Sequence, residues 1–231
     1  MNEDKGIALV HQFFPGTGRT YDRMVNLCTI GFDRYWKNKI LGRIPEGSTR
    51  IMDQACGTGI MTFKIAEKFP HALIIGVDVT EEYLVIAKEK AAAMKLNNVR
   101  FILGRAEDVM LDQNFDCITS SYLAKYAKLG RLVRNAREML RTGGIFIMHD
   151  FTYPSNRAFS YVWEFYFRLL QTIGALKYPQ WRAIFDGLPG LLRETKWAGE
   201  LQESLQENGF SETAIEYLTI GTSAIITAKK V

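Results

Sequence analysis

Two aspartates and two glycines give this chain its clearest chemical signature. Asp53 ends an apolar run, the loop that follows carries Gly57 and Gly59, and Asp78 ends the next apolar run. Glycines let a ligand approach the main chain or permit a positive φ, and a helix that opens at such a loop offers free N–H groups. The pattern predicts a ligand site in which Asp78 accepts hydrogen bonds from a ribose diol. The simpler alternative is an ordinary tight turn.

The residues around the loop distinguish between two ligands that fit such a site, NAD and S-adenosylmethionine. A carboxylate at Asp53, just before the glycines, would repel a pyrophosphate but suits a ligand with an ammonium and a sulfonium group. Thr62 stands where the dinucleotide pattern G-x-G-x-x-G has its third glycine. The Tyr-x-x-x-Lys spacing of short-chain dehydrogenases occurs at Tyr35 and Lys39, which precede the loop. These features favour S-adenosylmethionine.

Apolar runs alternate along the chain with segments of helical periodicity, as in α/β proteins whose parallel strands are buried on both faces. Thr80 is placed to cap a helix whose first turn is acidic. The tail "AIEYLTIGTSAIITAKK" breaks the alternation and predicts two antiparallel strands joined at Gly221. We expect strands at residues 49–55, 72–79, 99–104, 115–122 and 143–150, and helices at residues 60–69, 81–94 and 131–140.

Together these elements predict an α/β fold. We expect a Rossmann-like, seven-stranded, mostly parallel sheet with a C-terminal antiparallel hairpin and helices on both faces. Residues 1–231 would form a single domain. Within it, 1–47 would be an N-terminal helical cap, 48–151 the cofactor-binding core, 152–208 the acceptor-side helices and 209–231 the hairpin.

Five segments resemble, in order and spacing, the successive motifs of class I S-adenosylmethionine-dependent methyltransferases. They are "MDQACGTG", "GVDVTEEYL", "GRAED", "FDCITSSY" and "LRTGGIFIMHDF", and the resemblance covers about residues 48–151 plus the hairpin. Upstream, "YDRMVNLCTIGFDRYWKNKI" is similar to the N-terminal signature of the ubiquinone/menaquinone C-methyltransferase branch. The matching residues there are Tyr21, Asp22, Met24, Asn26, Gly31, Arg34, Trp36 and Lys37.

This resemblance implies which residues hold S-adenosylmethionine. Thr58 would contact the cofactor, Asp78 would bind its ribose, and Ser121 would contact it after the fourth strand. The implied cofactor site consists of Asp53, Gly57, Thr58, Gly59, Asp78, Arg105, Ala106 and Ser121.

The adenine end of the implied site departs from the branch. Arg105 and Ala106 fall where the branch usually has Asn or Asp followed by Ala. An arginine side chain cannot accept a hydrogen bond from the adenine amino group, although it can stack on the ring. Glu107 or Asp108 is the alternative acceptor.

Methylation of a carbon acceptor such as a hydroquinone ring requires a base or a hydrogen-bond acceptor near the methyl group, because an ionised hydroxyl makes the ring nucleophilic. The quinone branch has an Arg-Asn pair after the fourth strand, whereas this chain has Lys125 and Tyr126. His149 and Asp150 end the fifth strand, and histidine titrates in the useful range. The catalytic candidates are therefore His149, Asp150 and Tyr126, each with a purely structural alternative.

The segment that follows the fifth strand is rich in aromatic side chains. Apolar residues cover most of a helix at 158–174, and Ser160, Glu164, Arg168 and Gln171 leave a narrow polar stripe. One interpretation is a core helix packed on the sheet. The other is a lid over an apolar acceptor that docks on a membrane surface, to which Trp163, Trp181 and Trp197, with Tyr161, Tyr166 and Tyr178, are suited.

The composition limits which binding partners and which cellular compartment suit this chain. A net charge of +4 without a clustered basic stripe argues against nucleic acid. Three separated cysteines form no metal-ligand pattern and suit a reducing compartment. No apolar run reaches the roughly 18–20 residues needed to span a bilayer, so we expect a cytoplasmic protein, with peripheral contact to a membrane and homodimer formation left open.

The resulting hypothesis is a metal-independent methyltransferase that uses S-adenosylmethionine to methylate a lipophilic small molecule, a quinone or quinol precursor at ring carbon. N- or O-methylation of a phospholipid or secondary metabolite is the first alternative. A non-catalytic cofactor-binding partner protein is the second, and a dehydrogenase is the third.

Overall fold

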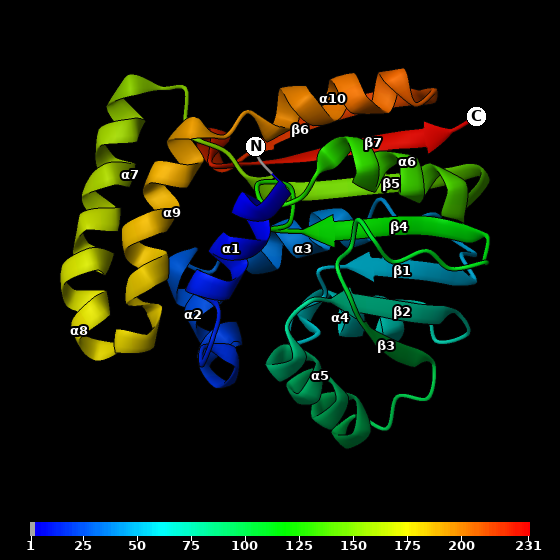
Figure 1. Cartoon of the computed structure of the whole chain (residues 1–231), viewed down its shortest axis with the longest axis horizontal. Coiled ribbons are helices and arrows are strands. Elements are labelled where there is room, and N and C mark those ends of the chain that lie inside the picture. The colour runs from blue at the N-terminus through cyan, green and yellow to red at the C-terminus, as the bar shows by residue number, and fades with distance from the viewer. Residues whose placement is uncertain (1–2) are drawn as a thin grey trace.

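The computed structural model describes the main chain of residues 3–231 and the side chains from residue 5 onward. At its centre is a seven-stranded sheet with the strand order β3-β2-β1-β4-β5-β7-β6, drawn in Figure 1. The first five strands pair in parallel, and β7 pairs antiparallel with both β5 and β6. The strands are β1 (Arg50–Gln54), β2 (Leu73–Asp78), β3 (Val99–Leu103), β4 (Phe115–Ser121), β5 (Leu140–Phe151), β6 (Phe210–Leu218) and β7 (Ser223–Lys230).

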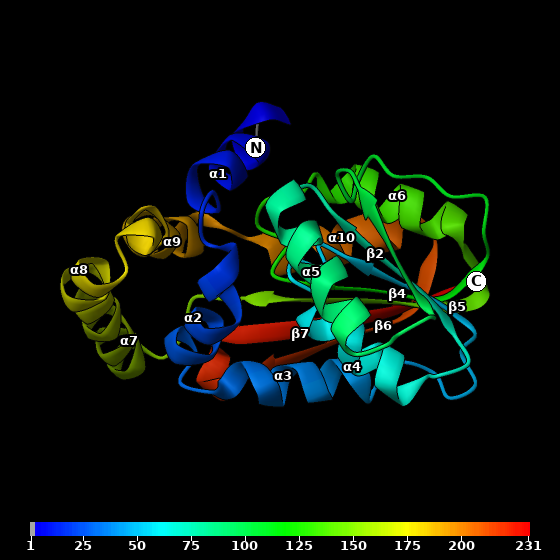
Figure 2. The same cartoon turned by 90° about the horizontal axis from the view of Figure 1, so that it is seen from below.

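Side chains alternate between the two faces of the sheet, and each face is covered by helices. On one face, Ile51 of β1 packs with α3 (Phe32–Leu41) and α4 (Ile60–Lys68). On the other, the next residue, Met52, packs with α6 (Leu129–Met139) and α10 (Trp197–Glu207). Figure 2 shows α3 and α4 below the sheet and α6 above it. Helix α5 (Glu81–Ala93) buries Ala87 against Phe63 of α4.

A second group of helices stands beyond the carboxyl ends of the parallel strands (Figures 1 and 2). It contains α1 (Glu3–Phe13), α2 (Tyr21–Cys28), α7 (Arg157–Leu169), the π-helical turn Leu170–Gly174, α8 (Ala175–Lys177) and α9 (Arg182–Glu194). Short 3-10 turns at Gly18–Thr20 and Pro179–Trp181 connect these elements, and a third at Thr219–Gly221 joins β6 to β7. Their apolar side chains form a separate cluster around Phe13, Met24, Trp181 and Phe185.

The fold class predicted from the sequence is confirmed, including the hairpin that turns at Gly221, where φ is +79°. One local expectation is wrong: Thr80 occupies the cap position of α5, but its side chain makes no capping hydrogen bond. The expected helix at 158–174 is confirmed; it is α-helical to Leu169 and then widens into the π turn.

Two helices pack in layers other than those that their place in the chain suggested. Helix α3, within the expected cap, packs on the sheet. Helix α10, within the expected acceptor side, packs beside α6. The cap residues before Glu3 lie outside the described residues.

Candidate active site

A cavity of about 440 Å³ lies where the carboxyl ends of β1, β2 and β4 face the outer helices. The strand order reverses between β1 and β4, and such a switch point leaves a crevice in open α/β sheets. Of the residues predicted for the site, Gly57, Asp78, Arg105, Ala106, Ser121 and Tyr126 line the cavity. Asp53, Thr58, Gly59, His149 and Asp150 are not among its lining residues.

The glycine loop shapes the floor of the cavity through its backbone. Gly57 and Gly59 have φ values of +56° and +90°, in the left-handed region that favours glycine. A Cβ atom on Gly59 would lie 2.5 Å from the ring of Phe63. Gly59 therefore has no room for a side chain, and Gly57, whose φ favours glycine, presents its main chain to the cavity.

Asp78 links this loop to the start of α5. Its carboxylate accepts hydrogen bonds from the main-chain N–H groups of Gly57 and Thr80, both at 2.8 Å. Burial raises the pKa of Asp78, while these N–H bonds act in the opposite direction. Each oxygen keeps a lone pair, so the carboxylate can still accept bonds from a ligand in the cavity.

Asp53 lies behind the loop. Its carboxylate accepts a hydrogen bond from Thr62 Oγ1 at 2.6 Å, and burial raises its pKa to about 7. Thr62, which replaces the third glycine of the dinucleotide pattern, therefore has a partner of its own. This arrangement separates the two acids: Asp78 faces the cavity, and Asp53 joins the loop to α4.

Contacts from the N-terminal helices close the cavity over the loop. Thr58 Oγ1 donates to Asp22 of α2 at 2.5 Å, and Asp22 also pairs with Lys90 at 2.6 Å. Glu82 of α5 accepts hydrogen bonds from the main chain of Gly16 and Gly18 at 2.9 and 3.0 Å. The segment between α1 and α2 is thus held against α5, next to Asp78.

At the predicted adenine end, Arg105 contacts a neighbouring acid. Its guanidinium donates to Glu107 at 2.6 Å, and both side chains line the cavity with Ala106. The main-chain oxygen of Ala106 accepts from Gln54 at 3.4 Å. Glu107 is therefore within reach of a ligand, as its role as alternative acceptor requires.

His149 lies behind the cavity wall. It is fully buried, and its Nδ1 is 3.0 Å from Ser121 Oγ. Burial, with Lys37 and Lys125 nearby, lowers the pKa of His149 well below its usual value. The ring is therefore neutral and supports Ser121, which does line the cavity.

A buried ion pair follows β4. Lys125 Nζ lies 2.6 Å from Asp150 Oδ1, with both side chains almost fully inaccessible. Lys125 also lies 4.6 Å from the ring centre of Tyr126, and both residues line the cavity. Burial raises the pKa of Tyr126 well above its usual value, so its hydroxyl stays protonated. Asp150 does not line the cavity itself, but it pairs with Lys125, which does.

A second buried pair, which the sequence analysis missed, lies on the far side of Tyr122. Asp33 of α3 pairs with Lys37 one turn later and accepts a hydrogen bond from Tyr122 Oη at 2.6 Å. Tyr122 has a φ of +69° and stacks on Phe151 at 4.6 Å. The available signal was an acid and a lysine at i and i+4 on the helix face that carries Trp36.

The outer half of the cavity is apolar. Its walls include aromatic residues of α2, α7 and α9 and the residue that follows α1: Tyr21, Trp163, Phe167, Phe185 and Phe14. The expectation that three tryptophans lie at an interface is wrong, because Trp163, Trp181 and Trp197 are all buried. Trp197 lies in the sheet core and donates to the main chain of Phe151 at 2.7 Å.

Among the residues the structure describes, no group of three or more His, Cys, Asp or Glu side chains is arranged to hold a metal ion. None of the helices in that part of the chain combines the length and apolarity required to cross a bilayer.

Comparison with protein families places residues 1–230 within the model of the ubiE/COQ5 methyltransferase family. A Rickettsia felis protein named ubiquinone/menaquinone biosynthesis C-methyltransferase UbiE is 29% identical over 96% of this chain and 93% of its own length. The Bos taurus mitochondrial 2-methoxy-6-polyprenyl-1,4-benzoquinol methylase is 26% identical over 96% and 79%. The Geobacillus stearothermophilus demethylmenaquinone methyltransferase is 24% identical over 94% of each chain.

Solved structures share the fold at lower identity. Phosphoethanolamine N-methyltransferase 2 of Haemonchus contortus, in complex with S-adenosylmethionine, superposes with a TM-score of 0.62 at 15% identity over 85% of this chain. This chain spans about half of that protein, 52% of its length. A geranyl diphosphate C-methyltransferase of Streptomyces coelicolor gives a TM-score of 0.62 at 14% identity over 86% of this chain and 79% of its own.

Proposed function

This chain belongs to the ubiE/COQ5 methyltransferase family, and from that premise we propose that it transfers a methyl group from S-adenosylmethionine to a ring carbon of a lipophilic quinol. Family membership makes the chain a methyltransferase with S-adenosylmethionine as its cofactor. The names of its relatives, a benzoquinol methylase and ubiquinone/menaquinone C-methyltransferases, support a quinol as the acceptor.

The inner half of the cavity fits the cofactor. Asp78 offers carboxylate oxygens at the end of β2, and Gly57 offers an unobstructed main chain beside it. Glu107 and Ser121 add polar groups on the walls. We propose that Asp78 binds the ribose and that Arg105, Ala106 and Glu107 surround the adenine. Thr58 and Gly59 would shape the loop, with Asp53 holding it from behind.

One observation supports the acceptor assignment most strongly. The polar half of the cavity is continuous with an apolar, aromatic half, which contains the buried cation Lys125. When bound, the cofactor supplies an activated methyl group that is transferred in line. A hydroquinone hydroxyl near Lys125 Nζ would ionise more readily, because a positive charge close by favours the anion. The ionised ring is a stronger carbon nucleophile.

The catalytic candidates take different roles in this proposal. Lys125 stabilises the ionised hydroxyl, and Asp150 fixes the position of Lys125 through their 2.6 Å contact. Tyr126 packs its ring against the acceptor and remains protonated. His149 holds Ser121 from behind the wall, at 3.0 Å.

The positive charge of Lys125 also disfavours N-methylation, which is part of the first alternative function. An amine acceptor is itself protonated near neutral pH, and Lys125 would repel it from the methyl group. A quinol has no such charge. O-methylation and a non-catalytic binding role both remain to be separated from C-methylation by the product.

The test is product analysis with the purified protein. S-adenosylmethionine carrying a labelled methyl group is incubated with a prenylated hydroquinone, with phosphoethanolamine, or with a phenol whose ortho positions are blocked. We expect label only in the hydroquinone, on a ring carbon, by mass spectrometry and NMR. Label on oxygen or nitrogen would assign the chain to a rival class. Absence of turnover with all acceptors would favour the binding role.

We further propose that the protein works in the cytoplasm and takes its acceptor from a membrane surface. Cys28, Cys56 and Cys117 are free thiols, which suits a reducing compartment. Homodimer formation stays a prediction, and analytical ultracentrifugation of the full chain tests it.

A further inference from the structure

We propose that the outer face of α7 and α8, together with the turn between α2 and α3, docks on an anionic membrane so that the cavity opens into the lipid. The inference rests on the proposed function in one respect, namely that the acceptor is lipophilic. Its physical basis is an apolar stripe, a flanking positive charge, and a cavity mouth built from exposed apolar side chains.

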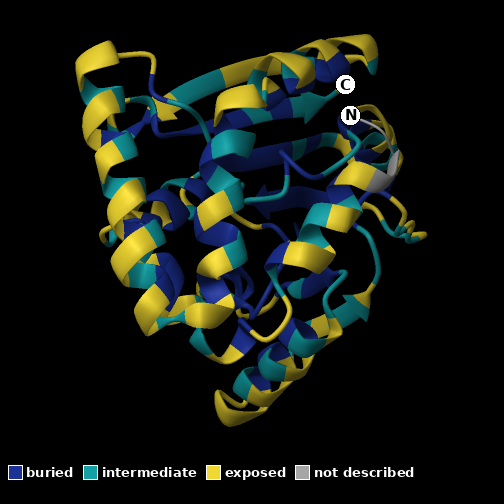
Figure 3. Ribbon diagram, turned by 60° about the vertical axis from the view of Figure 1, so that its left-hand side comes forward, coloured by how far each residue is buried: buried dark blue, intermediate teal, exposed yellow. Residues whose placement is uncertain are grey.

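The apolar stripe runs along the outside of α7, the π turn and α8. Its members are between 38% and 80% exposed: Tyr161, Val162, Phe165, Leu169, Ile173 and Leu176. At about 100° per residue these positions share roughly a third of the helix circumference. The opposite face carries Trp163 and Leu170, which are buried and line the cavity. Exposed positions recur along this helix in Figure 3.

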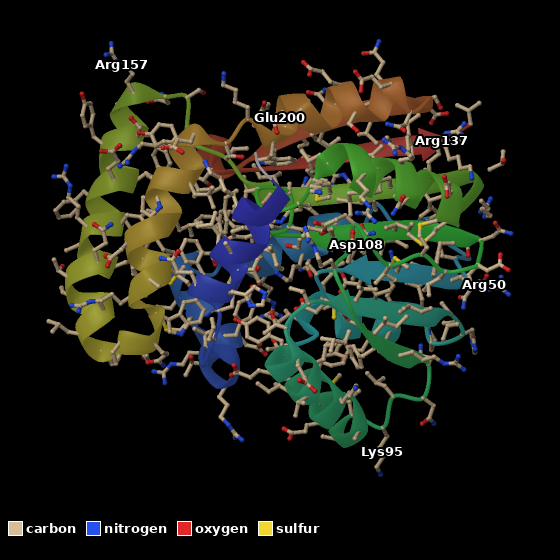
Figure 4. All side chains as sticks on the ribbon, in the orientation of Figure 1. Arg50, Lys95, Asp108, Arg137, Arg157 and Glu200 are labelled. Carbon is tan, nitrogen blue, oxygen red and sulfur yellow. The ribbon has the colours of Figure 1, made fainter. Side chains whose placement is uncertain are left out.

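Positive charge accompanies the stripe. Arg157, Arg168 and Lys177 are exposed along the same segment, and the side chain of Arg157 points away from the molecule at the end of α7 in Figure 4. The single acid between residues 155 and 180, Glu164, accepts hydrogen bonds from Tyr153 at 2.8 Å and from Arg193 at 3.2 Å. Apolar residues flanked by arginine and lysine suit a surface of anionic lipids.

The stripe reaches the mouth of the cavity. Ile30, Phe32, Val162 and Ile220 line the cavity and are also 69%, 43%, 61% and 64% exposed. Tyr166 of α7 donates to the main chain of Leu27 at 3.0 Å, which joins α7 to the end of α2. A lipid-facing mouth of this kind lets a prenylated acceptor enter without crossing water.

Two residues of the mouth are held in a costly conformation. Ile30 and Ile220 have φ values of +52° and +57°. A β-branched residue is a genuine outlier there, at a cost of about 1–3 kcal/mol. Residues kept in such conformations cluster at ligand sites, and here both isoleucine side chains lie at the rim.

The charge pattern favours a membrane over a second copy of the chain. In a symmetric pair, the same surface meets itself. Arg157, Arg168 and Lys177 of one copy would then approach those of the other, and the one acid of that segment, Glu164, is already bonded to Tyr153 and Arg193. An anionic bilayer balances all three.

Vesicle sedimentation with the full chain tests this surface. We compare vesicles of phosphatidylcholine alone with vesicles that also contain phosphatidylglycerol. The paired variant Phe165→Ser/Leu176→Ser lies on the stripe and outside the cavity. The control, Val85→Ser/Leu103→Ser, removes two apolar residues that are 48% and 55% exposed on α5 and β3. A third variant, Arg157→Gln/Arg168→Gln, removes two charges.

We expect the parent and the control to bind the anionic vesicles and the stripe variant to bind at least fivefold less. The arginine variant should lose roughly fivefold per charge on anionic vesicles. Methyl transfer to a short-chain, water-soluble quinol should be unchanged in the stripe variant, while transfer to a prenylated quinol in vesicles should fall.

Three results would overturn the inference: no vesicle binding by the parent, equal binding by the stripe variant and the control, or a concentration-dependent dimer that the stripe variant abolishes. Turnover of the soluble quinol without any vesicle binding would leave the proposed function standing. Stripe-dependent vesicle binding without turnover of any quinol would support the surface and count against the function.

Discussion

Lys125 is the residue on which the proposed chemistry depends most. Lys125 is one of the residues that line the cavity, and its partner Asp150 is completely buried behind it. Burial lowers the pKa of Lys125, and the contact with Asp150 opposes that shift. The residue thus places a positive charge where an apolar wall would otherwise disfavour an ionised acceptor.

We predict that Lys125→Met lowers kcat/KM for the quinol at pH 7 at least tenfold. Without the cation the acceptor hydroxyl ionises at higher pH, so the acid limb of the pH profile should move upward by about one unit. Raising the pH should therefore restore part of the rate. The control is Lys39→Met, which removes a surface ion pair with Glu216. An unchanged pH profile in Lys125→Met would remove this role.

Asp53 provides a second prediction at this scale, on stability. Its pKa is about 7 in the folded protein because of burial, against about 4 in an unfolded chain. As pH rises from 4 to 7, the unfolded state releases a proton that the folded state keeps, and stability falls with pH.

Asp53→Asn cannot titrate and keeps an oxygen that accepts from Thr62. Its free energy of unfolding, relative to the parent, should increase from pH 4 to pH 7 by about 1.4 kcal/mol per pH unit at most. Chemical denaturation at several pH values measures the difference. A constant difference would show that Asp53 ionises normally in the folded protein.

The sequence indicated the two acids and the glycine loop but not which acid faces the cavity. Asp53 and Asp78 both lie at strand ends, and the direction of each side chain depends on the twist and the loop that follows. Asp33 was missed because its partner Tyr122 is remote in sequence and adopts a positive φ that no local pattern predicts.

At the scale of elements, the segment between α1 and α2 is tied to the cofactor half of the cavity by Glu82. Its carboxylate holds the main chain of Gly16 and Gly18, and Thr17 Oγ1 lies 2.5 Å from Tyr83 Oη. These contacts bring Tyr21 next to Gly57, whose added Cβ would lie 3.9 Å from the Tyr21 ring.

We predict that Glu82→Ala weakens binding of S-adenosylhomocysteine about tenfold and speeds amide hydrogen exchange at residues 14–20. The reason is that two main-chain donors lose their acceptor and the segment opens more often. Glu81→Ala is the matched control, because Glu81 is exposed on the same turn of α5. Equal amide exchange rates at residues 14–20 in Glu82→Ala and Glu81→Ala would show that Glu82 does not hold this segment.

The α7 helix shows what a periodicity can and cannot predict. The aromatic pattern at 158–174 was compatible with a core helix and with a lid. In the structure its inner face lines the cavity and its outer face is exposed. Sequence alone did not separate the two faces, because both are apolar.

For the whole molecule, alternation of strands and helices was enough to predict the sheet, its parallel half and the C-terminal hairpin. The sequence predicted α7, α8 and α9 on the acceptor side, but the cluster that they form with α1 and α2 around Phe13 and Trp181 was not predictable. That cluster covers the open end of the sheet and leaves a cavity with a polar half and an apolar half.

We propose that this cavity holds the cofactor through Asp78. Calorimetric titration of S-adenosylhomocysteine tests it directly with Asp78→Ala, with the isosteric Asp78→Asn, and with Asp116→Ala. Asp116 is a suitable control because it also accepts main-chain N–H groups, those of Thr49 and Arg50 at 2.7 and 2.9 Å, but at the start of β4. We predict binding by the parent and by Asp116→Ala, and at least tenfold weaker binding by both Asp78 variants. Equal affinity in folded Asp78→Ala and the parent, or no binding by the parent, would contradict the account.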